Sequence, residues 1–202
     1  MPLLADFRAA AIARTRFPDD QRLSEAALFA LVRDIPFGRP TDEHPETVIA
    51  EWRATSIGKH ILLQALAEEF GLHTMLICAL HEFGPQTTPW LPAALLADLA
   101  ADGPVPDLHM FLRLKIADDW MTVDATWPLA TAALGFPVNE RFDAGREMRP
   151  ACDPDEVLHV PPEADPIEFA ERLIASHVGA QSERRARLLA ALADVAAAAN
   201  TR

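Results

Sequence analysis

Tyrosine is absent from this 202-residue chain, and cysteine is nearly so. Two cysteines are too few for a disulfide framework, so the sequence excludes a disulfide-stapled scaffold. Cys78 lies in an apolar run and is expected to be a buried thiol, whereas Cys152 lies in a Pro/Asp loop and is expected to be a partly exposed free thiol. Free thiols fit a reducing compartment, and we therefore expect a cytoplasmic protein.

Long apolar runs are absent too, because no segment approaches the length that a membrane-spanning helix needs. The first residues, 1–8, carry an acid and no basic leader, so they do not read as a secretory signal. Basic residues are scarce: 18 Lys and Arg stand against 30 Asp and Glu, which gives a formal net charge of −12. Phosphate groups require a basic surface, so we expect neither nucleic acid nor a membrane as a partner.

Apolar residues make up 50% of the chain, and we expect a single domain over residues 1–202 with one ordinary core. The 17 prolines indicate fixed loops rather than disorder. Hydrophobic periodicity predicts helices, then a small antiparallel sheet, then further helices, which is an α+β fold with helical flanks at both ends. The predicted helices are 3–14, 24–32, 41–52, 57–70, 91–100, 129–134, 165–176 and 182–198, and the predicted strands are 72–83, 107–116, 120–126 and 157–160.

The two predicted strands in the middle of the sheet place two polar residues on one face. Side chains alternate along a strand, so His109 faces away from the apolar side of its strand. A two-residue turn at Asp118 and Asp119 puts Asp124 on the same face as His109. That register leaves the two side chains offset along the strands, so a bulge, a wider loop or a strong twist is needed to bring them within hydrogen-bonding reach.

Ser56 precedes the most regular predicted helix, 57–70, and by itself is best explained as the N-cap of that helix, a role that Thr55 can also fill. A nucleophile at this position also feels the positive end of the helix dipole and nearby backbone N–H groups. An imidazole on an adjacent strand can exchange its proton, and a carboxylate behind the imidazole fixes the tautomer. Ser56, His109 and Asp124 together are therefore a candidate catalytic triad.

The spacing of residues argues against two other kinds of site. Gly58 and Lys59 lack the earlier glycine and the following Ser or Thr that a phosphate-binding loop requires. The seven histidines show no His-Glu-x-x-His spacing, and Asp107 with His109 supplies only two ligands, so no metal site is expected. Four other histidines are interpreted as surface or loop residues: His44, His81, His159 and His177.

Three segments carry a resemblance to a known family. Arg53–Leu63 reads Arg-Ala-Thr-Ser-Ile-Gly-Lys-His-Ile-Leu-Leu and resembles the active-site segment of bacterial transglutaminase-like proteins, which often reads Gly-Thr-Cys-Ser-x-Lys-His-x-Leu-Leu. Pro106–His109 resembles their Pro-Glu-Ala-His segment, and Val123–Trp127 resembles their Val-Asp-x-Thr-Trp segment. Ile35–Arg39 is similar to a stretch that can precede the nucleophile. By order and spacing the resemblance covers about 33–143.

The resemblance implies a transglutaminase-like fold of the cysteine-peptidase type, in which the nucleophile helix packs on a small antiparallel sheet. It implies acyl transfer or amide hydrolysis, with Ser56 at the nucleophile position, His109 as the acid/base and Asp124 as the orienting carboxylate. Thr55 and Trp127 are the residues expected to contact substrate. The implied substrate is a peptide, an amide or another acyl-bearing molecule, the acceptor is an amine or water, and no cofactor or metal takes part.

Ser56 stands where the family has its cysteine, and Ala54 and Ile57 also depart from the family pattern. A thiol ionises readily beside an imidazole and a helix N-terminus, but an alcohol must lose its proton to the imidazole during attack. Three explanations stay open: an engineered cysteine-to-serine replacement, a natural pseudoenzyme that binds a substrate-like ligand or a protein, and a natural serine hydrolase or acyltransferase. The changes at Ala54 and Ile57 favour natural drift toward a weakly active or inactive homologue.

Overall fold

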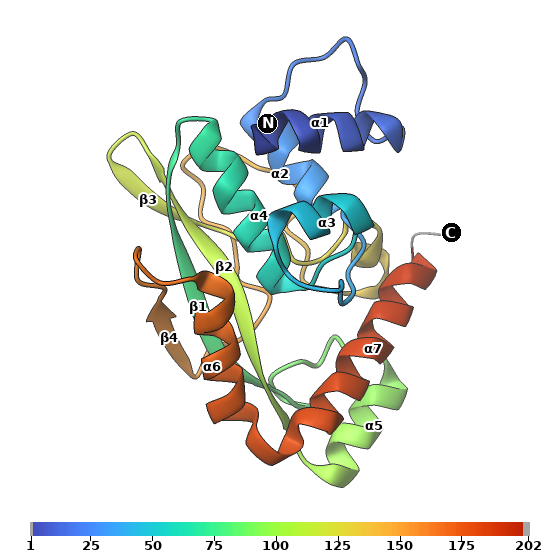
Figure 1. The fold of residues 1–202 in the computed structure, drawn as a ribbon. Helices are drawn as coiled ribbons and strands as arrows, with labels where there is room; N and C mark the ends of the chain where they lie inside the picture. The colour runs from blue at the N-terminus through green and yellow to red at the C-terminus, as the bar shows by residue number, and fades with distance from the viewer. Residues whose placement is uncertain (1, 200–202) are drawn as a thin grey trace.

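One four-stranded antiparallel sheet forms the centre of the fold in residues 2–199, the part of the chain that the computed structural model describes (Figure 1). Its strands are β1 (His73–Phe83), β2 (Val105–Ile116), β3 (Asp119–Val123) and β4 (Glu156–His159). The strand order is β3-β2-β1-β4, so the two longest strands lie in the middle. Short edge strands limit the backbone that a sheet leaves unpaired.

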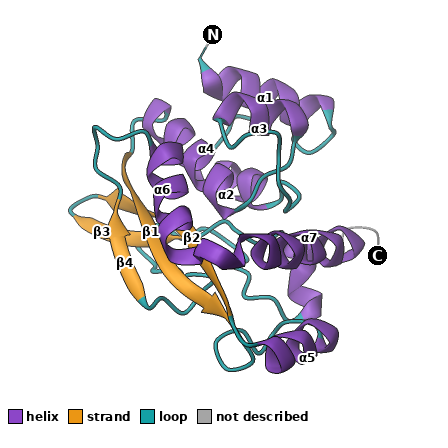
Figure 2. Cartoon of the chain, turned by 60° about the horizontal axis from the view of Figure 1, so that its bottom comes forward, coloured by secondary structure: helices purple, strands orange, loops and turns teal. Residues whose placement is uncertain are grey.

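Seven α-helices and two 3₁₀-helices accompany the sheet within the described residues. They are α1 (Leu3–Ala13), α2 (Glu25–Arg33), α3 (Pro45–Glu51), α4 (Ser56–Glu69), α5 (Ala93–Asp102), η1 (Leu129–Leu134), α6 (Pro166–Val178), η2 (Gly179–Gln181) and α7 (Ser182–Ala199). Helices α1, α2 and α3 gather around α4, while α6 lies on the sheet and α7 runs beside α5 (Figures 1 and 2). None of the helices in residues 2–199 combines the length and apolar character needed to cross a membrane.

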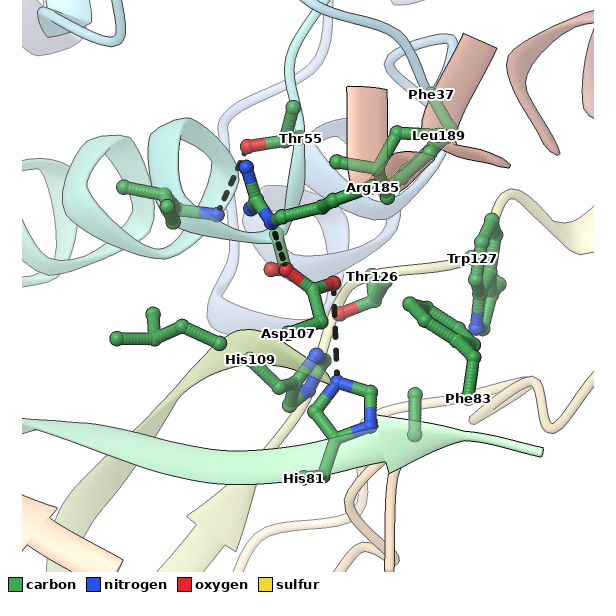
Figure 3. Close-up of a pocket in the computed structure, with 14 residues that line it drawn as sticks. Phe37, Thr55, His81, Phe83, Asp107, His109, Thr126, Trp127, Arg185 and Leu189 are labelled. Carbon is green, nitrogen blue, oxygen red and sulfur yellow. Dashed lines mark hydrogen bonds and ion pairs between the residues drawn. The ribbon is translucent and has the colours of Figure 1, made fainter. Parts of the chain in front are cut away.

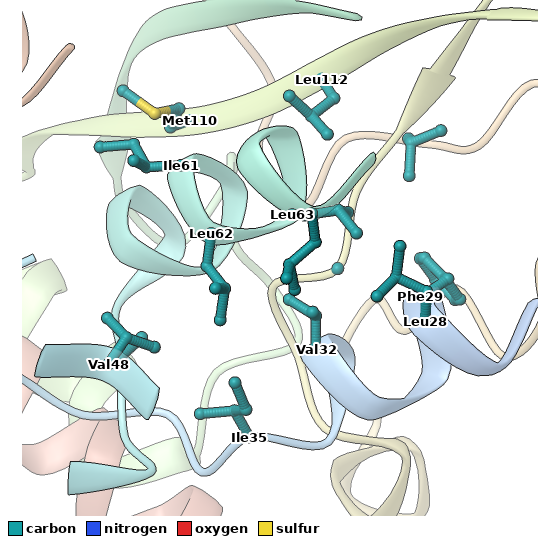
Figure 4. Packing of buried hydrophobic residues seen from close by; sticks show 14 of the residues in the cluster. Leu28, Phe29, Val32, Ile35, Val48, Ile61, Leu62, Leu63, Met110 and Leu112 are labelled. Carbon is teal, nitrogen blue, oxygen red and sulfur yellow. The ribbon is translucent and has the colours of Figure 1, made fainter. Parts of the chain in front are cut away.

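Helix α4 is buried on almost every side in its first half. Its residues pack in three directions (Figure 4): Ile61 lies against Met110 of β2, Leu62 points toward Val48 of α3, and Leu63 points toward α2. Each fully buried Leu or Ile contributes about 1.5–3 kcal/mol relative to exposure. The N-terminus of α4 is therefore held in a fixed position relative to the sheet.

The predicted α+β fold is confirmed, and two helix boundaries differ from the prediction because of prolines. α3 begins at Pro45 rather than at Thr41 or Asp42, since a proline has its φ preset for the first helical turn and holds His44 extended. α5 likewise begins after Pro92, whose ψ of 143° is extended. In both cases the proline determines where the helix begins, so α3 is shorter than predicted and α5 starts later than predicted.

Two predictions of exposure are wrong. Cys152 is buried in a small apolar cluster that includes Phe111, and His81 on β1 keeps only 3% of its surface exposed. The expected burial of Cys78 is confirmed. Burial raises the pKa of the Cys152 thiol and raises the pKa of the Cys78 thiol to about 12, so neither cysteine is an activated nucleophile.

Candidate active site

The N-terminus of α4 carries Ser56. The cap of the helix is Thr55, whose hydroxyl accepts a hydrogen bond from the Ile57 N–H at 3.3 Å and donates one to Glu43 at 2.6 Å. The prediction that Ser56 caps the helix is therefore wrong, because Thr55 has the extended backbone that a cap needs. The Ser56 hydroxyl, free of that role, accepts one long hydrogen bond of 3.5 Å from the Met110 N–H.

His109 on β2 and Asp124 just after β3 form a hydrogen-bonded pair. The His109 Nε2 and Asp124 Oδ2 atoms lie 2.7 Å apart, and both residues are buried. An ionised carboxylate only accepts hydrogen bonds, so Nε2 carries the proton and Nδ1 is the basic nitrogen of the ring. A general base needs this tautomer, with a carboxylate holding the ring from behind.

The β2–β3 hairpin explains why these two side chains meet. Its turn consists of Ala117 and Asp118, whereas the sequence predicts a turn at Asp118 and Asp119. The pairing therefore moves by one residue on each strand, which keeps Asp124 on the predicted face and brings it closer to His109 along β2. The paired residues, from Leu112–Val123 to Ile116–Asp119, form a continuous ladder without a bulge, and Asp124 follows directly after it.

The Asp124 carboxylate is held by several donors. In addition to His109, the backbone N–H groups of Ala151 and Thr126 donate to it at 2.8 and 2.9 Å. Burial alone raises the pKa of this carboxyl, but His109, His60 and the Ala151 N–H outweigh burial and hold the pKa well below its ordinary value. Asp124 is therefore a fixed anion that can orient the His109 ring and stabilise a positive charge on it.

His60 connects α4 to the loop that carries Asp124. Its Nε2 accepts a hydrogen bond from the Ala125 N–H at 2.9 Å, so its Nδ1–H donates to the Ser56 carbonyl at 2.7 Å. Burial lowers the pKa of His60 to about 4 although Asp124 opposes the shift, and the ring is neutral at pH 7. A neutral ring bonded through both nitrogens fixes the spacing between Ser56 and Asp124.

Lys59 makes a second connection from the same turn of α4. Its amino group is fully buried and donates to the carbonyl oxygens of Arg33 and Thr126 at 2.7 and 2.8 Å. Burial has the largest effect and lowers the pKa of Lys59 to about 7, while the charges of Asp34 and Asp124 oppose this shift. Buried polar groups that are bonded in this way make the loop after β3 a rigid part of the core.

Ser56 and His109 line one small pocket, with a cavity volume of about 20 Å³ (Figure 3). Thr55 and Trp127, the two residues predicted to contact substrate, line the same pocket. Trp127 is buried and packs against two phenylalanine rings at centroid distances of 4.4 and 4.7 Å, so it is also part of an apolar wall. The predicted site residues thus lie together, with Asp124 behind His109.

Three charged or titratable residues of the pocket are missed by the sequence prediction: His81, Asp107 and Arg185. The Arg185 Nε lies 2.5 Å from one Asp107 oxygen, and His81 Nε2 lies 3.8 Å from the other. Strand alternation offered a signal for Asp107, which shares a face with His109, and the observed pairing then puts His81 opposite Asp107. Arg185 has no such signal, because it lies 78 residues away on α7.

The chemistry available in the pocket is that of a hydroxyl, a basic imidazole nitrogen and a buried anion. Within residues 2–199 no group of three or more His, Cys, Asp or Glu side chains is arranged to hold a metal ion. Comparisons with protein-family models, with curated proteins and with solved structures find no match to the chain. A proposal of function therefore depends on the residues of the site and their geometry.

Proposed function

We propose that the chain is a transglutaminase-like protein that carries out slow acyl transfer or amide hydrolysis, with Ser56 in the nucleophile position. The observation that supports this most strongly is the buried His109–Asp124 pair, with 2.7 Å between Nε2 and Oδ2, beside a pocket that the Ser56 hydroxyl also lines. The ordered likeness of the Ser56, His109 and Asp124 segments to the family gives independent support. The substrate is a peptide, amide or other acyl-bearing molecule, and the acceptor is water or an amine.

In this proposal His109 Nδ1 takes the proton of the Ser56 hydroxyl while the oxygen attacks the carbonyl carbon of the substrate amide. Asp124 stabilises the imidazolium that forms. The imidazolium then protonates the leaving amine, the C–N bond breaks, and the acyl group remains on Ser56 as an ester. Water or a second amine, deprotonated by His109, attacks the ester and restores the serine hydroxyl.

Binding of a ligand without turnover is the second candidate, and the state of Ser56 favours it. An alcohol is much less acidic than a thiol, so an imidazole that suits a thiolate activates a serine poorly. Among the described residues, the one hydrogen bond to Ser56 Oγ is the 3.5 Å contact with the Met110 N–H. A serine poised for attack normally has a hydrogen bond of about 2.6–3.2 Å to its general base, which in this site is His109. The same pocket then holds a substrate-like ligand or protein.

Ser56→Cys tests whether the site activates a nucleophile. We expect iodoacetamide at pH 6.5 to alkylate the introduced thiol about tenfold faster than free cysteine, because His109 and the α4 N-terminus stabilise a thiolate. His109→Asn in the same background should return the rate to that of free cysteine. The unaltered chain measures the background from Cys78 and Cys152, which are buried. An introduced thiol that reacts like free cysteine and ignores His109 would remove the triad assignment.

A fluorophosphonate probe then separates turnover from binding, because it modifies activated serine hydroxyls. If the chain is an enzyme, mass spectrometry should find the adduct on Ser56, and Ser56→Ala should abolish it. An activated thiol in Ser56→Cys together with an unlabelled serine in the unaltered chain would favour the ligand-binding candidate. The native codon at position 56 decides whether the serine was introduced.

A further inference from the structure

Asp107 is an anion of the pocket that takes no part in the triad. It keeps 5% of its surface exposed, and its two oxygens lie 2.5 Å from Arg185 Nε and 3.8 Å from His81 Nε2. Burial lowers the pKa of His81 to about 4, although Asp107 opposes this shift, so the ring is neutral at pH 7 and supplies no charge. The Arg185 guanidinium is therefore the group that balances the charge of Asp107.

A buried carboxylate that loses its cation is strongly destabilised, because the remaining charge has neither water nor a partner. A neutral or anionic ligand that displaces Arg185 leaves Asp107 in that state. A ligand with an ammonium or a guanidinium replaces the lost charge and avoids the penalty. The environment of Asp107 therefore discriminates between ligands by charge.

Arg185 lies between the pocket and a larger groove. It lines the pocket and also a groove of about 540 Å³ that is bounded by α6, α7 and the segment 36–43. Figure 3 shows its side chain reaching from α7 to Asp107, with Thr55 on the other side of the guanidinium. Arg185 thus separates the inner pocket from the groove and occupies the place that a cationic group of a ligand would take.

Three further polar groups of the pocket lack partners. Within residues 2–199, His81 Nδ1, the Thr126 hydroxyl and the Trp127 indole N–H are buried and make no hydrogen bond, and all three residues line the pocket. Figure 3 shows the Thr126 hydroxyl on the side that faces Asp107 and His109. Buried polar groups are normally bonded, so these three indicate that a polar ligand belongs in the pocket that Asp107 also lines.

We propose that Asp107 forms a subsite for a cationic group of the ligand, an ammonium or a guanidinium, and that Arg185 fills this subsite until the ligand displaces it. The cation is recognised here and does not react, so no bond is made or broken at Asp107. The inference rests on the proposed function only in taking the same pocket as the binding site. The ligand enters from the groove, because the two spaces adjoin at Arg185, which lines both together with Phe37, Thr55, Ile57 and Leu189.

The first test uses Arg185→Ala and a molecule that replaces the missing side chain, ethylguanidinium. We expect ethylguanidinium to raise the Tm of Arg185→Ala, and N-ethylurea, a neutral molecule of similar shape, to have no effect. Arg187→Ala is the matched control, because Arg187 is on the same helix with 72% of its side chain exposed. Equal effects of the two molecules on Arg185→Ala, or an equal effect of ethylguanidinium on both variants, would overturn the subsite.

A second test covers the case in which Arg185→Ala does not fold. In a Ser56→Cys background, the rates of modification by trimethylammonioethyl and by sulfonatoethyl methanethiosulfonate are compared. We expect Arg185→Gln to raise the cation-to-anion ratio of rates at least about fivefold, and Asp107→Asn to remove this preference. An unchanged ratio in Arg185→Gln would contradict the proposal. Because both reagents attack the same thiol, the ratio does not depend on activation by His109, and either proposal can fail without the other.

Discussion

Gly58 lies in the first turn of α4, where the Glu43 carboxylate packs against the helix. A Cβ at this position would overlap Glu43 Oε2 and lie 3.0 Å from a methyl group of Val48. Alanine is normally better than glycine in a helix by about 1 kcal/mol, but here Glu43 must move and lose its hydrogen bond to Thr55. We therefore expect Gly58→Ala to lower the free energy of unfolding in urea by about 1–3 kcal/mol.

The matched control for this prediction is the same substitution in a Glu43→Ala background. If the Glu43 carboxylate is the main obstacle, Gly58→Ala should be less destabilising there, with a coupling of about 1 kcal/mol between the two positions. Additive effects would show that Glu43 is not the obstacle. A stabilising effect of Gly58→Ala in the unaltered chain would contradict the packing at the N-terminus of α4.

At the scale of the helix, the cap of α4 can be separated from the candidate nucleophile. Thr55→Val keeps the shape of the side chain and removes the oxygen that accepts from the Ile57 N–H, so it should destabilise the protein by about 1 kcal/mol. Ser56→Ala removes a hydroxyl with one long contact and should change stability by less than about 0.5 kcal/mol. Thermal and urea unfolding measure both. The opposite order of effects would restore Ser56 as the cap.

The β2–β3 hairpin shows where prediction of an element from sequence reaches its limit. Strand alternation predicts His109 and Asp124 on one face, and this is correct because a shift of one residue on both strands preserves the alternation. The predicted turn position is wrong by one residue, since Asp118 and Asp119 have the residue type that favours turns but Asp119 pairs with Ile116. The observed turn puts Ala117 at a φ of 52°, a conformation that alanine rarely adopts. The residue type at this position therefore gives no indication of the turn.

Across the whole molecule, the sequence predicts what depends on local pattern and misses what depends on distant contacts. The α+β order of elements follows from hydrophobic periodicity and turn residues, and is confirmed. The burial of His81 depends on the cover that other segments provide, and the pairing of Arg185 with Asp107 joins α7 to β2. Lys59 reads as a polar helix residue, yet its amino group finds two carbonyl acceptors inside the core. Periodicity carries no information about such partners.

The buried histidines make the stability of the whole protein depend on pH. Burial lowers the pKa of both His60 and His81 from 6.5 to about 4. In the unfolded chain both imidazoles take up protons as the pH falls through 6.5, whereas in the folded protein they stay neutral until about pH 4. The unfolded state therefore binds more protons in this window, and the free energy of unfolding falls as the pH is lowered from 6.5 to 4.

His81→Gln isolates the contribution of one imidazole to this dependence. Removing one proton-binding difference should reduce the slope of unfolding free energy against pH by up to about 1.4 kcal/mol per pH unit between pH 4.5 and 6. Urea unfolding at several pH values measures the slope, and His44→Gln is the matched control because His44 is exposed. A His81→Gln protein that loses stability with acid as steeply as the unaltered chain would show that His81 is not held neutral in the folded pocket. It would also mean that a protonated His81 can balance part of the negative charge of Asp107, whose other ion-pair partner is Arg185 of α7.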